Sequence, residues 1–288
     1  MMMFVIISIE VKQMIQIGMT TFVEHGSLLN KLKLTIEEYA SYFPIVELDT
    51  CFYGIKSEKT SQDWVNKTPE TFQFIVKAYK GMTRHSSWDD YYTSEKEMFL
   101  AYENFLSPLK QAGKLSTILF QFPASFKCTK ENVNYLRQIR AYYPNEPIAI
   151  EFRNGSWYDE KMKESMIKFM KEHQFSLVMV DQPQVALHSV PFDLSVTNPD
   201  FVFVRLHGRN KGNWLDDSED WRKKRNLYCY SKEELKELSD SLKEIKAKNI
   251  AVIFNNNSAG DAAPNGMILK QILGVEYEGL NPNQTSLF

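Results

Sequence analysis

Short apolar runs that end on polar residues recur along this chain and alternate with stretches of helical periodicity. Strands that alternate with helices predict crossover units and a parallel sheet. Eight such units fit a closed barrel. We therefore predict an α/β fold, a single eight-stranded parallel (β/α)8 TIM barrel. The eight runs are Met14–Gly18, Ile45–Asp49, Gln73–Lys77, Thr117–Gln121, Ile148–Arg153, Leu177–Asp181, Phe201–His207 and Ile250–Asn255.

The intervening segments carry helix signals. Thr35 with Glu38 and Ser231 with Glu234 have the spacing of a capping box. The segment Arg209–Tyr230, after the seventh run, is long and rich in polar and aromatic residues. We predict it to be a loop of functional importance, because idle loops of this length are uncommon in compact domains. The predicted helices are Thr35–Phe43, Ser94–Lys110, Lys130–Tyr143, Asp159–Glu172 and Lys232–Lys248.

The chain reads as one barrel domain with short extensions. It has 288 residues, close to the ~250 of a single barrel, and no Pro/Gly/Ser-rich linker divides it. We predict that residues 1–13 are an N-terminal extension. The alternative is that the start of the sequence is misplaced. The barrel would cover 14–278, and 279–288 would form a flexible C-terminal tail.

Composition narrows the function classes. The net charge of −2 is not that of a protein held on nucleic acid by a basic surface. Cys51, Cys128 and Cys229 form no CxxC pair, which indicates a reducing compartment. No run approaches the ~20 apolar residues of a membrane span. We expect a cytoplasmic protein with no membrane partner.

Alternation along the strands assigns the side chains to faces. In Ile148–Arg153, one face is wholly apolar, so Glu151 and Arg153 should point toward the barrel axis. The same reasoning turns Arg205 and His207 inward. Because barrel enzymes place their chemistry where the strands end, we expect a ring of polar groups at this mouth.

Within this ring, Glu151, His207 and Asp181 are the candidate catalytic residues. We expect desolvation to raise the pKa of Glu151 toward neutrality, which suits a general acid or base, and an imidazole titrates near neutral pH without help. Arginine and lysine side chains could clamp a carboxylate or phosphate. The residues predicted to bind an anionic substrate are Lys77, Arg153, Arg205, Glu47, Gln121, Asn255, Asn256 and Trp157.

The sequence predicts no cofactor. Its five histidines show no HxH or HExxH spacing, and GxGxxG, P-loop and GxSxG motifs are absent. A magnesium ion bound by Glu47, Asp49 or Asp181 stays open as an alternative.

Several of these segments together resemble the YecE-like family of bacterial and archaeal proteins. They are Val46–Tyr53, Glu151–Trp157, Val204–Gly208 and Phe254–Asn256. The resemblance covers nearly the whole barrel and implies a TIM barrel with a site near these residues, without an established activity. Gly18–His25 departs from the usual Gly-Trp/Tyr-rich segment and looks more like the branch found in Gram-positive bacteria.

The last five residues, Gln284–Phe288, resemble the peptide by which bacterial replication and repair proteins dock on the DNA polymerase sliding clamp. In such a peptide, Gln284 would supply hydrogen bonds, and Leu287 with Phe288 would fill an apolar groove. Thr285 departs from the pattern, which usually has an aliphatic residue there.

Three functions follow from these features. The first is an enzyme, a hydrolase or lyase, that acts on a phosphorylated or otherwise anionic substrate at the barrel mouth. The second is a DNA-associated protein, a repair nuclease or binder, recruited to the clamp by its tail. The third is a glycoside hydrolase with two mouth carboxylates and Trp157 or Trp214 stacked on sugar.

Overall fold

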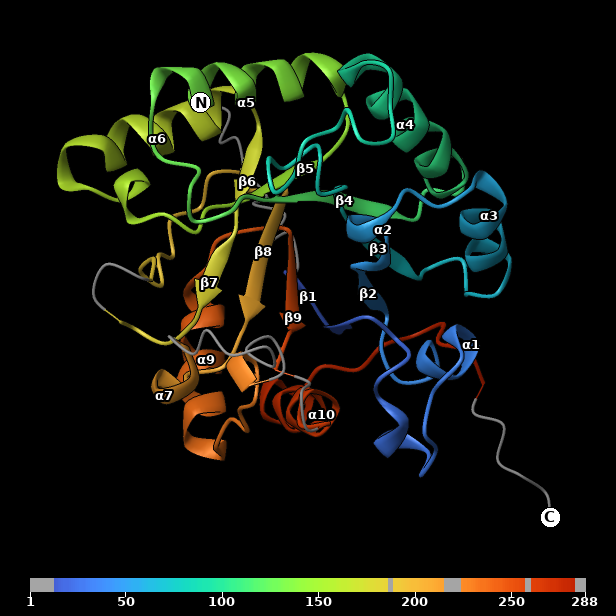
Figure 1. The fold of residues 1–288 in the computed structure, drawn as a ribbon. Helices are drawn as coiled ribbons and strands as arrows, with labels where there is room; N and C mark the ends of the chain where they lie inside the picture. Colours follow the sequence, from blue (N-terminus) through green and yellow to red (C-terminus); the bar gives the residue numbers. More distant parts are fainter. Residues whose placement is uncertain (1–12, 186–188, 215–223, 257–259, 283–288) are drawn as a thin grey trace, which may run out of the picture.

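The computed structural model describes residues 13–185, 189–214, 224–256 and 260–282. All strands are parallel and form one sheet in the order β6-β5-β4-β3-β2-β1-β9-β8-β7, a nearly closed TIM-like barrel (Figure 1). The strands are β1 (Met14–Thr20), β2 (Ile45–Leu48), β3 (Gln73–Lys77), β4 (Leu115–Gln121), β5 (Ile148–Glu151), β6 (Phe175–Leu177), β7 (Met179–Asp181), β8 (Phe201–Leu206) and β9 (Asn249–Phe254).

The structure has nine strands where the sequence predicted eight, because the sixth run is divided. β6 pairs with β5, whereas β7 pairs with β8. Val178 lies between them, and its N–H donates to the carbonyl of Ile150 at 2.9 Å. The chain therefore changes partner within one short run, and this change brings the two ends of the sheet together.

Helices surround the sheet. In Figure 1, α4, α5 and α6 lie along one side of the barrel, and α9 and α10 lie along the opposite side. The α-helices are α1 (Ile36–Tyr39), α2 (Thr50–Tyr53), α3 (Glu58–Asn66), α4 (Glu95–Gln111), α5 (Lys130–Tyr142), α6 (Glu160–Glu172), α7 (Lys211–Trp214), α9 (Lys232–Glu244) and α10 (Ala262–Leu273). Two short 3-10 helices, η1 (Gly26–Leu28) and η2 (Gly155–Trp157), complete the set.

Both predicted capping boxes are confirmed. The side chains of Thr35 and Ser231 each accept a hydrogen bond from the backbone N–H three residues later, while Glu38 and Glu234 accept from the backbone of the capping residue. Each such cap stabilises a helix by about 1 kcal/mol.

Two apolar clusters lie on the two faces of the sheet. Ile45, Phe203 and Ile253 belong to a cluster inside the barrel, and the alternate residues of the same strands pack against the helices. Gly18 lets β1 approach β2 closely, since a Cβ at this position would stand 2.2 Å from the carbonyl oxygen of Ile45.

The segment after β8 and the C-terminal residues differ from the predictions. The predicted loop Arg209–Tyr230 contains the helix α7, and Trp214 at its end is buried. The predicted tail begins with packed chain, because the Asn281 side chain donates to the carbonyl of Glu37 and its backbone N–H to that of Ala40. Residues 1–12 and 283–288 lie outside the described residues. Within the described part, none of the helices has the length and apolar character needed to cross a membrane.

Candidate functional site

The ends of six strands bring eight predicted site residues to the mouth of the barrel. The inward face predicted for β5 and β8 is confirmed, since Ala149 and Phe203 belong to the interior cluster and Glu151 and Arg205, two residues further along each strand, share their face. The residues brought together are Glu47, Lys77, Gln121, Glu151, Arg153, Arg205, His207 and Asn255.

Arg205 is the centre of this ring. Its guanidinium donates twice to Glu47, with Nε 2.7 Å from Oε2 and Nη2 2.6 Å from Oε1. Nη1 donates to Oε2 of Glu151 at 2.5 Å and to the Gln121 amide oxygen at 3.2 Å. Arg205 is 1% exposed and both carboxylates are 0% exposed. The buried guanidinium thus bridges two buried carboxylates, which meets the need of buried charges for partners.

Arg153 forms a second layer above Arg205. Its Nε donates to Oε1 of Glu151 at 2.5 Å, and Nη1 donates to the Gln182 amide oxygen at 3.0 Å. Nη2 lies 2.9 Å from Nε2 of His207, whose Nδ1 lies 2.8 Å from the Asn255 amide nitrogen. The Arg153 side chain is 16% exposed, so part of it is accessible to solvent.

These contacts contradict the pKa values expected of Glu151 and His207. Burial opposes ionisation of Glu151, but Arg153 and Arg205 outweigh it and hold the pKa of the carboxyl well below its usual range. Burial and the same two guanidiniums lower the pKa of His207 to about 3. At neutral pH, the two cations therefore favour an ionised Glu151, and burial together with these cations favours a neutral His207.

Lys77, the last residue of β3, has a different environment. Its Nζ lies 4.4 Å from the centroid of the Phe52 ring. Among the described residues it makes no hydrogen bond or ion pair, although it is only partly exposed. Burial, followed by the charge of Arg205, lowers the pKa of Lys77 to about 8, while Glu47, Glu151 and Asp49 oppose this shift.

Asp181 does not belong to the ring, which corrects the face predicted for it. Val178 and Val180 point into the barrel, so Asp181 points outward and Gln182 inward. Both carboxylate oxygens of Asp181 lie 3.0 Å from Nε of Arg209, and Oδ2 accepts from the Tyr230 hydroxyl at 2.7 Å. The inward and outward sets of this run are equally apolar up to Asp181, so the pattern gave no means to choose the face.

Two further predicted ligand residues serve the framework. Trp157 is 1% exposed, stacks on Phe152 with ring centroids 4.0 Å apart, and donates Nε1–H to the carbonyl of Phe126. Asn256 is buried and donates to the Tyr228 carbonyl and to the side chain of Asn265. Both side chains thus contact the framework, and their part in substrate binding stays a prediction.

The side chain of Trp214 lies next to Arg153, a member of the group of polar residues at the mouth. The guanidinium carbon of Arg153 is 6.0 Å from its ring centroid, and that of Arg225 is 4.5 Å away. Yet both arginines already cover the indole of Trp214, and this residue is 3% exposed. Both oxygens of Glu47 and of Glu151 also accept from guanidinium groups. In the described part of the chain, these two carboxylates and the two predicted tryptophans therefore do not support the glycosidase alternative.

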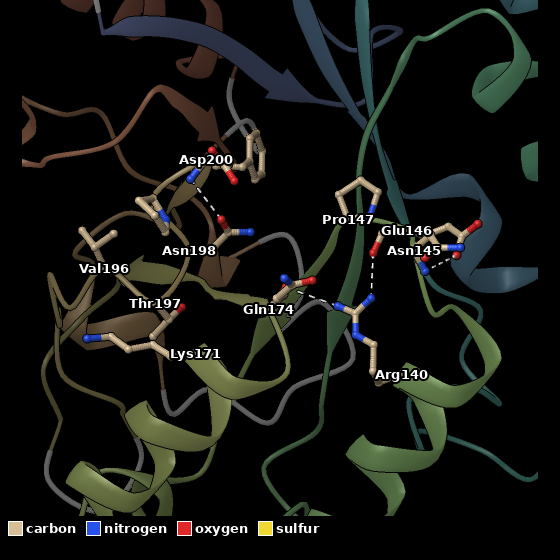
Figure 2. A pocket seen from close by; sticks show the side chains of 12 residues that line it. Arg140, Asn145, Glu146, Pro147, Lys171, Gln174, Val196, Thr197, Asn198 and Asp200 are labelled. Carbon is tan, nitrogen blue, oxygen red and sulfur yellow. Dashed lines mark hydrogen bonds between the residues drawn. The ribbon is translucent and has the colours of Figure 1, made fainter. Parts of the chain in front are cut away.

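A hollow of about 760 Å³ opens at the end of the barrel opposite the mouth, where β5, β6 and β8 begin. Figure 2 shows Arg140 extending between Glu146 and Gln174. Its guanidinium donates to the backbone carbonyls of these two residues at 2.9 and 3.2 Å. Arg140 thus ties together the segments that lead into β5 and β6. This end of a barrel contributes to stability rather than chemistry.

Within the part of the chain that the structure describes, no three His, Cys, Asp or Glu side chains are grouped so that they could hold a metal ion. Two of the three carboxylates considered for magnesium pair with guanidinium groups, Glu47 with Arg205 and Asp181 with Arg209. The clamp-binding residues Gln284, Leu287 and Phe288 lie outside the described residues, so docking on the sliding clamp and association with DNA stay predictions.

Comparison with known proteins places the chain in a family. The sequence profile described as "Protein of unknown function DUF72" matches residues 16–287. The chain belongs to the DUF72 family. It is 43% identical over 282 residues to UPF0759 protein YunF of Bacillus subtilis, which covers 96% of this chain and 100% of that protein.

Solved structures of other family members agree with the barrel. A DUF72 protein of Enterococcus faecalis is 46% identical, with a TM-score of 0.91 over 94% of this chain and 99% of that one. A member from Thermotoga maritima is 29% identical, with a TM-score of 0.76 over 91% of this chain and 100% of that one. These relatives share the fold, and their names assign no activity.

Proposed function

We propose that this DUF72 protein is an enzyme, a hydrolase or lyase, that binds a small anionic substrate at the barrel mouth. The observation that carries this proposal is the amine of Lys77. Two carboxylates and two guanidiniums of the ring, namely those of Glu47, Glu151, Arg205 and Arg153, neutralise one another. Lys77 adds a positive charge that has no ion-pair partner among the described residues.

The rigid charges around it support this reading. Buried ion pairs contribute little net stability compared with apolar residues of the same volume. A network of this size is therefore better explained by preorganised electrostatics, which stabilise charge that develops during a reaction. Arg153 is the second cation available to the substrate, through the exposed part of its side chain.

Lys77 is also the group best suited to transfer a proton. A general acid or base works best when its pKa lies near the working pH. The pKa of about 8 for Lys77 meets this condition, unlike the lowered pKa values of Glu151 and His207. We therefore assign to Lys77 the proton-transfer role that the sequence had suggested for Glu151.

Anion binding tests this function. The full chain is titrated with inorganic phosphate and pyrophosphate by calorimetry, as wild type, Lys77→Met and Lys168→Met. Lys168 serves as the control because its side chain is 78% exposed and remote from the mouth in sequence. A charge-assisted hydrogen bond contributes about 1.5–3 kcal/mol, so K77M should bind at least ~10-fold more weakly while K168M binds like wild type. Equal binding by K77M and wild type would refute the assignment.

We also infer the branch of the family to which the chain belongs and its cellular location. Identities of 43% and 46% to proteins of Bacillus subtilis and Enterococcus faecalis support a place in the branch of the YecE-like family found in Gram-positive bacteria. The three unpaired cysteines support a reducing, cytoplasmic location.

A further inference from the structure

Lys77 differs in one respect from Lys114 and Lys110, two other lysines that are at least partly withdrawn from solvent. Lys114 donates its amine hydrogens to Val65 O and Thr68 O at 2.8 Å and to the Thr68 hydroxyl at 3.1 Å. Lys110 donates to the carboxylates of Glu103 and Glu146. These contacts use the amines for structure. Lys77 has no such acceptor in the described part of the chain, so its nitrogen lone pair is available once a proton leaves.

The surroundings of Lys77 fix the position of this amine. The side chain leaves the end of β3 on the interior face, next to β2, whose Leu48 pairs with Val76. The Phe52 ring in α2 covers one side of the nitrogen at 4.4 Å. Arg205 raises the positive potential from below. An amine that is partly desolvated and stands beside another cation is a typical nucleophile toward carbonyl groups.

We propose that Lys77 forms an imine with the carbonyl carbon of an anionic aldehyde or ketone, such as a 2-oxo acid or a phosphorylated ketose. This inference rests on the proposed function and specifies its substrate class. The anionic group of the substrate would lie against the exposed part of Arg153, while its carbonyl carbon faces Nζ of Lys77.

The step balances without a further reactant. Neutral Nζ attacks the carbonyl carbon, the C=O π electrons move to oxygen, and a proton passes from nitrogen to that oxygen to give a carbinolamine. The hydroxyl group is then protonated and leaves as water while the C=N bond forms. Asp49, at the end of β2, is the carboxylate available to carry the proton, because its side chain makes no hydrogen bond among the described residues.

Reductive trapping tests the imine. The full chain is incubated with glyoxylate, the smallest 2-oxo acid, and sodium cyanoborohydride at pH 7, and the modified lysines are located by peptide mass spectrometry. Acetaldehyde, which carries no charge, is the matched control probe. A pKa of about 8 against the ordinary 10.5 gives Lys77 roughly 300-fold more free amine than a surface lysine at pH 7. We expect Lys77 to be modified by glyoxylate at least ~10-fold faster than Lys168, with a smaller preference for acetaldehyde.

The variants separate this inference from the proposed function. Lys77→Arg keeps the charge and cannot form an imine, so it should bind phosphate more tightly than K77M and lose the glyoxylate adduct. If wild-type Lys77 reacts no faster than Lys168 while K77M still loses phosphate binding, the imine is refuted and anion binding stands. If Lys77 reacts no faster than Lys168 and K77M binds phosphate like wild type, both proposals are refuted. Reaction of Lys77 that is equally fast with acetaldehyde and glyoxylate would refute the anionic substrate class.

Discussion

Replacing Arg205 with methionine should destabilise the fold strongly. The substitution keeps apolar volume but removes three hydrogen bonds of 2.5–2.7 Å to carboxylate oxygens. It leaves Glu47 and Glu151 0% exposed without their shared cation. Loss of one partner from a buried ion pair costs about 3–5 kcal/mol, a large part of the ~5–15 kcal/mol that holds a typical domain folded.

Urea unfolding, followed by circular dichroism, measures this loss. The control is Lys168→Met, which breaks an exposed pair with Glu172 at 3.8 Å and should change the free energy of unfolding by less than ~0.5 kcal/mol. A triple variant, R205M with Glu47→Gln and Glu151→Gln, removes the uncompensated carboxylates. It should regain about half of the loss or more.

The loss should also depend on pH. Burial already raises the pKa of Glu47 in the wild type, and removal of Arg205 takes away the main opposing charge. A carboxyl whose pKa is higher in the folded than in the unfolded state stabilises the fold at low pH and loses this effect as pH rises. R205M should therefore be closer to wild type at pH 5 than at pH 8. A loss below ~1 kcal/mol at pH 8, or one without pH dependence, would refute the reasoning.

Three further changes test other parts of the structure. Gly18→Ala should lower the free energy of unfolding in urea by about 1–3 kcal/mol, because the new Cβ would stand 2.2 Å from the Ile45 carbonyl oxygen. The neutral control is Gly54→Ala, where a Cβ would have nothing within 4 Å. Equal effects of the two substitutions would contradict the close approach of β1 to β2. His207, with a pKa of about 3, should show no titration by NMR between pH 5 and 8, and a midpoint near 6.5 would disprove its burial between guanidiniums. Tyr230→Phe removes a hydroxyl that bonds two buried groups and should cost about 1–3 kcal/mol; a loss below ~0.5 kcal/mol would show that water replaces it.

Most of the barrel could be predicted from apolar periodicity. Runs such as Gln73–Lys77 coincide with a strand, and the capping signals of Thr35 and Ser231 mark real helix starts. These features are local, so the sequence pattern contains them. The division of the sixth run at Val178 is not local, since it depends on which neighbouring strand supplies each hydrogen bond.

The sequence predicts most of the residues that lie at the site, but not the chemical role of each one. Alternation placed Glu151 and Arg205 inward because one face of each strand is purely apolar. It missed Gln182, one residue beyond its run, although Val178 and Val180 share its face. The ionisation state of Glu151 depends on guanidiniums from β8 and from the residues after β5, and such pairings across the barrel are set by the tertiary structure.

The same limit applies to the aromatic residues. The predicted sugar platforms were Trp157 and Trp214. In the structure, Trp157 lies in η2 with its indole stacked on Phe152. The aromatic side chain that contacts the candidate reactive amine is Phe52. It lies in a four-residue helix, which is too short to show apolar periodicity in the sequence.

The most direct test of the central claim is the pKa of the Lys77 amine. Competitive acylation of all lysines with limiting reagent, repeated from pH 6 to 11 and quantified by peptide mass spectrometry, gives a titration curve for each amine. We predict a midpoint of about 8 for Lys77. A midpoint of about 10.5 for Lys77 would mean that its charge is as well solvated as that of a surface lysine, and would contradict its role as the reactive group of the mouth.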